Sequence, residues 1–213
     1  MADFELTSPL PDAKGQADAD HYPTPPLLAQ RGVELAVELY GDKPGVIVEP
    51  GCSECAPFAS AGKRMGIESY GLEIREGERT DIVTFGVDYL EASLARYRAE
   101  CADIIITNPP FSLAVEFIET ALYDVSDSGL VMMLLQTGIE GSKQRREFWE
   151  KFPPVMRYVI RPRPGFVKGG NDSREYAFYV WLSPAMTRRL NGIGRVWTET
   201  RFLDNDGPWG RAE

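Results

Sequence analysis

The chain has 213 residues, a net charge of −9 and 43% hydrophobic residues, which predicts a packed globular domain rather than a disordered chain. No apolar run reaches the roughly 18 residues that cross a bilayer, and the acidic N-terminus lacks the apolar stretch of a secretory signal. The three cysteines are an odd number and do not suggest a disulfide framework. We therefore expect a cytoplasmic protein without a membrane partner.

The charge is unevenly divided along the chain. Residues 1–140 carry 9 basic and 24 acidic side chains, whereas residues 141–213 carry 14 basic and 8 acidic side chains. The overall acidity argues against a simple nucleic-acid binder. The basic second part could nevertheless face phosphates while the acidic part stays solvated, and an ordinary mixed surface is the alternative.

Elements of two kinds alternate along the chain. Residues 1–20 are polar and without periodicity, so we expect a flexible lead, followed by one domain over residues 21–185 and an extension over 186–213 that packs on it. Strands are expected at Val46–Glu49, Glu68–Ile74, Asp81–Phe85, Ala102–Thr107, Leu130–Gln136, Met156–Arg161 and Glu175–Leu182. Helices are expected at Pro25–Tyr40, Ala56–Met65, Leu90–Glu100, Leu113–Val125 and Ser142–Phe152.

Seven strands with interleaved helices predict an α/β fold, a Rossmann-like doubly wound mixed sheet. The last strand, Glu175–Leu182, alternates with period two, as an antiparallel edge strand or hairpin does. In such sheets ligands bind beyond the carboxyl ends of the strands. The turns after the strands are therefore the places where chemistry is expected.

An acidic residue ends or follows each of the first three strands. Glu49 precedes a turn of small residues and then a helix, a combination that lets a ligand approach the backbone. Glu73 follows 24 residues later, where nucleotide-binding α/β units place an acid that accepts hydrogen bonds from ribose hydroxyls. Asp88 follows the third strand, where it could hold the amine of a ligand or cap the next helix.

The fourth strand ends in the most specific motif of the chain, Asn108-Pro109-Pro110-Phe111. The two prolines remove backbone donors and fix the turn, so that carbonyl oxygens point outward. Asn108 adds an amide oxygen as an acceptor, and Phe111 adds a ring. Two acceptors and a stacking ring suit an amino group that is conjugated with an aromatic ring, because the acceptors stabilise the positive charge that develops on its nitrogen.

These motifs resemble those of class I S-adenosylmethionine-dependent methyltransferases that modify exocyclic amines, above all the phage-type DNA adenine N6-methyltransferases. The resemblance runs from about His21 to Leu182 and has the γ-like order, with the entry motif first. The matching motifs are Tyr22-Pro23-Thr24-Pro25, Glu49-Pro50-Gly51, Glu73, Asp88 and Asn108-Pro109-Pro110-Phe111. Arg163-Pro164-Gly165-Phe166 and Ser173-Arg174-Glu175-Tyr176-Ala177-Phe178 also resemble segments of phage members.

The resemblance implies N6 methylation of adenine in DNA, with S-adenosylmethionine as cofactor, no metal, and a base flipped out of the duplex. It places the protein in a bacterial or phage-infected cell. The implied catalytic residues are Asn108, Pro109, Pro110 and Phe111. The implied cofactor-binding residues are Tyr22, Thr24, Pro25, Glu49, Gly51, Ser53, Glu73 and Asp88. The implied substrate-binding residues are Phe166 as a second stacking ring and the basic residues Arg163, Lys168 and Arg174, which lie near Arg157 and Arg161.

The sequence departs from this family in the first turn, where Ser53 and Cys55 stand at two positions that are usually glycine. A β-carbon there crowds the backbone surface that meets the cofactor, at a cost of roughly 1–3 kcal/mol each. The same change creates a C-x-x-C pair, Cys52 and Cys55, at a predicted helix N-terminus, where a thiol pKa tends to fall. A dithiol redox function is therefore an alternative.

Three further alternatives remain open within this interpretation. The same amine chemistry would serve RNA adenine or the side-chain amide of a protein glutamine. A degenerate methyltransferase fold could instead act as a binding module without catalysis, a possibility that Ser53 and Cys55 keep open. No separate target-recognition domain is visible, so we expect loose or short-sequence specificity.

Overall fold

The computed structural model describes residues 24–96, 102–166, 174–185, 187 and 199–204. Its helices are α2 (Pro26–Tyr40), α3 (Pro57–Arg64), α4 (Tyr89–Arg96), α5 (Ala114–Asp124) and α6 (Arg146–Lys151), with 3-10 turns η1 (Phe111–Leu113), η2 (Thr137–Gly141) and η3 (Lys143–Arg145). Its strands are β1 (Val46–Pro50), β2 (Glu68–Glu73), β3 (Val83–Phe85), β4 (Ala102–Thr107), β5 (Val125–Gln136), β6 (Met156–Arg161), β7 (Tyr176–Leu182) and β8 (Glu199–Asp204).

The described strands form one sheet in the order β3-β2-β1-β4-β5-β7-β6-β8. Neighbouring strands are parallel except at β7, which runs antiparallel to both β5 and β6. The order reverses at β1, which has β2 on one side and β4 on the other. Such a reversal opens a crevice beyond the carboxyl ends of the strands, where α/β proteins bind their ligands.

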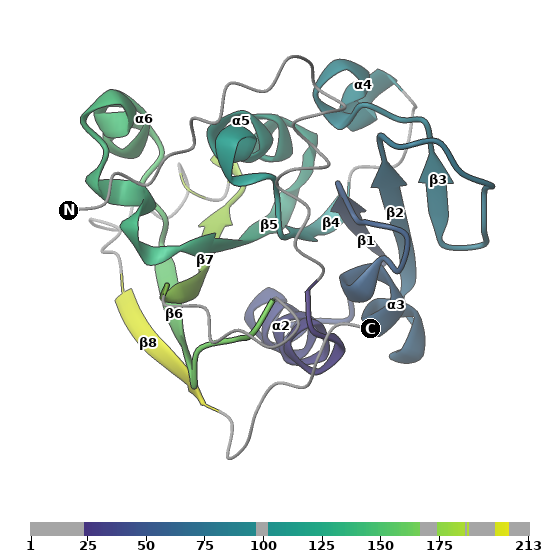
Figure 1. Cartoon of the computed structure of the whole chain (residues 1–213), viewed down its shortest axis with the longest axis horizontal. Helices are drawn as coiled ribbons and strands as arrows, with labels where there is room; N and C mark the ends of the chain where they lie inside the picture. Colours follow the sequence, from purple (N-terminus) through teal and green to yellow (C-terminus); the bar gives the residue numbers. More distant parts are fainter. Residues whose placement is uncertain (1–23, 97–101, 167–173, 186, 188–198, 205–213) are drawn as a thin grey trace.

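Helices cover both faces of the sheet, so the molecule has three layers (Figure 1). Successive side chains of a strand point to opposite faces, and the run of isoleucines in β4 supplies both cores. Ile104 and Ile106 pack with α2 and α3, whereas Ile105 packs with α5. All three side chains are fully buried, which explains why β4 lacks polar alternation.

Helix α2 runs from the carboxyl edge of the sheet to the amino edge. It ends at Gly41, which has the left-handed φ of +81° that ends many helices. The chain then reaches the amino edge, where the Gly45 N–H donates to Asp103 Oδ2 at 2.7 Å, next to the start of β4. At about 1.5 Å per residue, the 15 residues of α2 carry its N-terminus back toward the carboxyl edge. Thr24 and Pro25, both buried, lie at that N-terminus.

Most elements lie within a few residues of their expected positions, and one expectation needs correction. The last expected strand, β7, is antiparallel as its pattern predicted, and of the two expected placements it takes the antiparallel pairing with the preceding strand β6 rather than a sheet edge. The described residues form a sheet of eight strands rather than seven. The additional strand, β8, is exposed at nearly every position and is held by pairing with β6, so it has no apolar face that could reveal it in the sequence.

Candidate active site

Hydrogen bonds join the turns at the carboxyl edge of the sheet. The Thr107 hydroxyl at the end of β4 donates to the carbonyl oxygen of Pro50 at the end of β1, at 2.6 Å. The Val87 N–H, after β3, donates to the carbonyl oxygen of Glu73 at the end of β2, at 2.9 Å. The acids that the sequence places after the strands are therefore gathered along one edge, with the Asn108 motif beside them.

Gly51 lies where the turn after β1 comes close to the turn after β4. Its φ is +64°, in the left-handed region that favours glycine. A β-carbon on Gly51 would lie 3.2 Å from the Phe117 ring and 3.9 Å from Pro110 Cδ. The backbone of the first turn thus lies close to the Asn-Pro-Pro-Phe turn, which is the proximity that a cofactor and an acceptor amine require.

Ser53 occupies a backbone conformation that L-residues rarely adopt. Its φ is 60°, and Ala56, in the same turn, has a φ of 38°. The position where the resembled family has glycine is therefore one that glycine would fill without strain. The second such position, Cys55, has an ordinary negative φ and an exposed side chain.

Replacing Ser53 with glycine is expected to stabilise the ligand-free protein by about 0.5–1 kcal/mol. The left-handed conformation costs an L-residue about 1–2 kcal/mol, which the greater unfolded-state freedom of glycine partly offsets. Urea unfolding measures the change. Glu54→Gly is the matched control, because Glu54 is exposed in the same turn and has no positive φ. It should lower stability; a gain in both variants would contradict strain at Ser53.

Glu49 holds the start of α3 in place. Its side chain is 2% exposed, and Oε2 accepts the Ala59 N–H at 2.8 Å. Burial raises the pKa of Glu49 well above its ordinary value, and the negative charge of Glu73 adds to this, although the backbone N–H groups of Ala59 and Phe58 oppose it. The carboxyl group that the sequence assigned to the cofactor thus engages the protein backbone first.

The Glu49→Gln variant is expected to be more stable than the wild type at neutral pH, by about 1 kcal/mol, and no more stable near pH 4. Because the pKa of Glu49 is raised in the folded state, its contribution to stability is full below the unfolded pKa. That contribution is lost as pH rises through the folded pKa. Glutamine keeps an acceptor for Ala59 without the buried charge. Urea unfolding of both proteins between these pH values measures the difference, and an advantage that is independent of pH would contradict this assignment.

Glu73 forms an ion pair with Arg75. Its Oε1 accepts the backbone N–H and the Nε–H of Arg75, both at 3.0 Å. Burial tends to raise the pKa of Glu73, but the hydrogen bonds and charge of Arg75 outweigh it, so the pKa lies below its ordinary value. Glu73 is only 4% exposed and is ionised in the folded protein, ready to accept hydrogen bonds from ribose hydroxyls. Arg75 was not predicted as a site residue, although it lies only two residues after Glu73 in the sequence.

Asp88 caps helix α4. Its Oδ1 accepts the Leu90 N–H at 3.0 Å, and its carbonyl oxygen accepts the Ala92 N–H at 2.8 Å. The capping interpretation of this residue is therefore confirmed. The cap uses one carboxylate oxygen and leaves Oδ2 for a ligand, so the structure is compatible with both interpretations.

The Asn-Pro-Pro-Phe turn follows β4 directly, as expected. Asn108 is half-buried and its Oδ1 atom is buried. The carbonyl oxygen of Pro110 accepts the Leu113 N–H at 3.0 Å, which starts the short η1 turn. Phe111 is only 5% exposed, and its ring centroid lies 6.1 Å from that of Tyr176. Stacking of a substrate ring on Phe111 would therefore require this aromatic contact to open.

A buried cluster beside this turn joins residues that lie far apart in the sequence. Phe166 packs on Tyr176 with 4.7 Å between ring centroids. Gln136, at the end of β5, donates from Nε2 to Tyr176 Oη at 3.5 Å and accepts from Arg174 Nη1 at 3.4 Å. Phe166 and Phe111, the two expected stacking rings, thus both lie next to Tyr176. Gln136 was missed, although it is the polar residue that ends the apolar run of β5.

The basic residues of the second part of the chain divide into two sets. Arg163 and Arg174 are exposed near the carboxyl edge, because the start of the antiparallel β7 meets the end of β5 there. Arg157 instead pairs with Glu140 at 2.8 Å, and Arg161 pairs with Asp204 at 2.8 Å. Arg157 and Arg161 therefore hold β6 to its surroundings and are poorly placed to bind phosphate.

The two thiols of the first turn differ in environment. Cys52 is 2% exposed, and burial together with the charges of Glu49 and Glu73 raises its pKa strongly. Cys55 is exposed, and neither cysteine forms a disulfide. Because reactive cysteines need a lowered pKa and access to solvent, the structure argues against the dithiol redox alternative.

Two expected site residues, Tyr22 and Lys168, lie outside the described residues, as does the expected lead over residues 1–20. Within the described part, His, Cys, Asp and Glu side chains nowhere gather in threes that could hold a metal ion. None of the helices in that part combines the length and apolarity that a membrane span needs.

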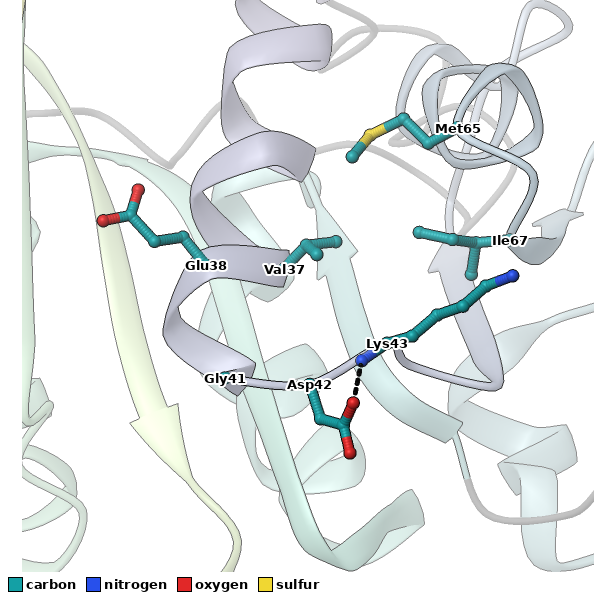
Figure 2. A pocket seen from close by; sticks show the side chains of 7 residues that line it. All are labelled: Val37, Glu38, Gly41, Asp42, Lys43, Met65 and Ile67. Carbon is teal, nitrogen blue, oxygen red and sulfur yellow. Dashed lines mark hydrogen bonds between the residues drawn. The ribbon is translucent and has the colours of Figure 1, made fainter.

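A hollow of about 550 Å³ lies at the opposite edge of the sheet (Figure 2). It is lined by Val37, Glu38, Gly41, Asp42, Lys43, Met65 and Ile67. These residues follow the middle of α2 or precede β1 and β2, so they belong to the amino ends of the strands. The hollow is therefore separate from the candidate active site.

Comparisons with known proteins identify the fold. No family model matches the sequence, and no curated protein matches it. A Listeria monocytogenes protein assigned to the class I S-adenosylmethionine-dependent methyltransferases aligns with a TM-score of 0.60 and 12% identity, over 88% of this chain and 67% of its own. The chain has the class I methyltransferase fold.

Two further solved structures share this fold. The O-methyltransferase from Bacillus cereus, in complex with S-adenosylhomocysteine, aligns with a TM-score of 0.53 and 13% identity, over 80% of this chain and 88% of its own. The M protein of the type I restriction enzyme EcoKI aligns with a TM-score of 0.51 and 14% identity, over 77% of this chain and 44% of its own. The chain thus spans less than half of the EcoKI subunit, and at these identities the likeness is one of fold.

Proposed function

We propose that this protein is an S-adenosylmethionine-dependent methyltransferase that acts on an exocyclic amine, the N6 of adenine in DNA. The observation that carries the proposal is the position of the Asn108-Pro109-Pro110-Phe111 turn. It lies at the carboxyl end of β4, against the Gly51 turn at the point where the strand order reverses. Sheets of this kind bind ligands where the strand order reverses, and this motif supplies acceptors for an amine at that place.

The residues of the turn have distinct roles in this proposal. Asn108 Oδ1 and the carbonyl oxygen of Pro109 accept the two hydrogens of the amine and stabilise the positive charge that develops on its nitrogen. Phe111 and Phe166 hold the ring. S-adenosylmethionine, when bound, supplies an electrophilic methyl group whose bond to sulfur breaks as the bond to nitrogen forms. The amine then loses one proton to water, so no dedicated general base is required.

The residues present fit the cofactor. Gly51 lets the turn after β1 pack on Phe117 beside the Asn-Pro-Pro-Phe turn, because a β-carbon there would lie 3.2 Å from the Phe117 ring. Arg75 lowers the pKa of Glu73, so this carboxylate suits hydrogen bonds from ribose hydroxyls. Asp88 uses Oδ1 for the helix cap, and its Oδ2 would accept a hydrogen bond from the adenine amine. Thr24 and Pro25, at the N-terminus of α2, would bind the amino-acid end.

DNA is the proposed substrate for two reasons. Arg163 and Arg174 are exposed near the edge that carries the Asn108 motif, where they would meet phosphates. One structural neighbour is the M protein of the type I restriction enzyme EcoKI. Adenine in RNA and glutamine in proteins present the same kind of nitrogen and are the competing substrates.

Titration calorimetry with S-adenosylmethionine tests the cofactor. We expect micromolar binding by the wild type and weaker binding by Asp88→Ala. Because Asp88 also caps α4, Asp88→Asn is the sharper variant: it keeps an acceptor for Leu90 but replaces a carboxylate oxygen with an amide donor. No binding by the wild type would contradict the proposal and favour a degenerate fold that acts as a binding module.

A labelled-methyl assay then separates the substrates. Unmethylated duplex DNA, RNA and protein are offered in parallel to the wild type. Label in DNA that is released as N6-methyladenine on digestion supports the proposal, whereas label confined to RNA or to protein assigns the alternative substrate. The double variant Arg163→Gln with Arg174→Gln should weaken DNA binding and reduce its dependence on salt.

A further inference from the structure

The hydroxyl of Ser53 has no hydrogen-bond partner among the described residues, although its oxygen is buried. The residue as a whole is 8% exposed and has a φ of 60°. Ser53 therefore destabilises the ligand-free protein twice, through backbone strain and through a buried polar atom without a partner. Glycine would remove both penalties, so the serine side chain calls for a reason outside the ligand-free fold.

The backbone of Ser53 lies beside the proposed ribose acid. The backbone N–H of Ser53 donates to the Glu73 carboxylate, which places the two residues next to each other. Arg75 occupies Glu73 Oε1 with two N–H groups at 3.0 Å. The carboxylate is thus fixed in orientation and charge, and the turn that carries Ser53 adjoins it.

We propose that the Ser53 hydroxyl is itself a cofactor ligand, which hydrogen-bonds the ribose of the nucleoside together with Glu73. Glu73 accepts from a ribose hydroxyl, and Ser53 Oγ donates to a ribose oxygen or accepts from a ribose hydroxyl. Because this oxygen is buried in the described structure, the serine side chain has to rotate about χ1 to reach the ribose. This inference rests on the proposed cofactor site and specifies one contact within it. It gives the serine hydroxyl a role that glycine, the usual residue at this position in the resembled family, cannot have.

Two variants separate the hydroxyl from the backbone conformation. Ser53→Ala keeps the strain and loses the hydroxyl, whereas Ser53→Gly loses both. Each is titrated by calorimetry with S-adenosylhomocysteine and with its 2′-deoxy and 3′-deoxy analogues. We expect both variants to bind S-adenosylhomocysteine about five- to tenfold more weakly, which is the value of one neutral hydrogen bond. Glu54→Ala, an exposed change in the same turn, should bind as the wild type does.

The analogues identify the contact. The wild type should bind one of the deoxy analogues more weakly than it binds S-adenosylhomocysteine. Ser53→Ala should bind that analogue and S-adenosylhomocysteine with nearly equal affinity, because the variant already lacks the hydrogen bond from the serine hydroxyl. Ser53→Gly should be more stable than the wild type and yet bind more weakly. This opposition of stability and affinity is what a strained, purely structural serine would not produce.

The outcomes that overturn the inference are distinct from those that overturn the proposed function. If the wild type binds S-adenosylhomocysteine and Ser53→Gly binds it equally well or better, the hydroxyl is not a ligand, while the cofactor site stands. A lower melting temperature of Ser53→Ala with unchanged affinity would assign the hydroxyl to packing instead. Failure of the wild type to bind S-adenosylhomocysteine would remove both proposals.

Discussion

Replacing Asn108 with alanine is expected to lower kcat for methyl transfer about 100- to 1,000-fold, with little change in cofactor affinity. The amide oxygen is one of the two acceptors that stabilise the amine as it becomes positively charged, and this charge exists only in the transition state. Initial rates with the substrate class that the labelled-methyl assay identifies, at saturating cofactor and substrate, measure the loss. Calorimetry with S-adenosylhomocysteine shows whether the cofactor site survives.

Asn108→Asp is the matched control for this prediction. Aspartate keeps an acceptor oxygen in the same place, so it should retain far more activity than alanine. Parallel losses of rate in both variants, together with lower melting temperatures, would show that the substitution disturbs the turn. Full activity of Asn108→Ala would contradict the proposed catalytic role of this residue.

The second large effect is expected from Gly71→Ala, which changes no proposed ligand. A β-carbon on Gly71 would lie 2.5 Å from Cys52 Sγ and 3.0 Å from Ala56 Cβ. The turn after β1 packs directly on this glycine of β2, so the turn has to move when the β-carbon is added. We expect a loss of about 1–3 kcal/mol in the free energy of unfolding, measured in urea. We also expect at least roughly tenfold weaker binding of S-adenosylhomocysteine, because the moving turn forms the cofactor surface.

A double variant tests this explanation. Cys52→Ala removes the sulfur that the new methyl group meets first, so Gly71→Ala should cost less in that background. The free energy of unfolding and the affinity for S-adenosylhomocysteine should both recover only partly. The reason is that Cys52 Cβ and Ala56 Cβ still lie about 3 Å from the added β-carbon at position 71. Strictly additive effects of the two substitutions would show that the clash is not the cause.

The sequence predicted the layers and the position of the Asn-Pro-Pro-Phe turn after β4, because those features depend on local patterns. The apolar run of β4 followed by Asn108 and two prolines is complete within ten residues. The polar cluster of Gln136, Arg174 and Tyr176 was not predictable in this way. It depends on the antiparallel insertion of β7, which sets residues about 40 positions apart side by side.

The pKa shifts of the two buried glutamates could not be predicted from the sequence either. Glu49 and Glu73 end neighbouring parallel strands and are both buried, yet their pKa values shift in opposite directions. The difference arises from Arg75, whose guanidinium turns back to Glu73 and not to Glu49. Spacing along the chain locates such carboxyl groups at the edge of the sheet, but side-chain geometry decides in which direction the pKa of each is shifted.

The insertion of β7 between β5 and β6 makes the order of synthesis matter. During translation β5 and β6 emerge before β7, and β6 has no partner of its own until β7 has docked on β5. Until then β5 presents an open edge, and seven consecutive buried residues from Leu130 to Gln136 lie along it. Unpaired apolar edges associate with one another. A nascent chain that stalls before Tyr176, or a protein truncated there, would therefore expose the unpaired edge of β5 and be prone to aggregate. Such a chain would need chaperones to stay soluble and would not be a smaller active enzyme.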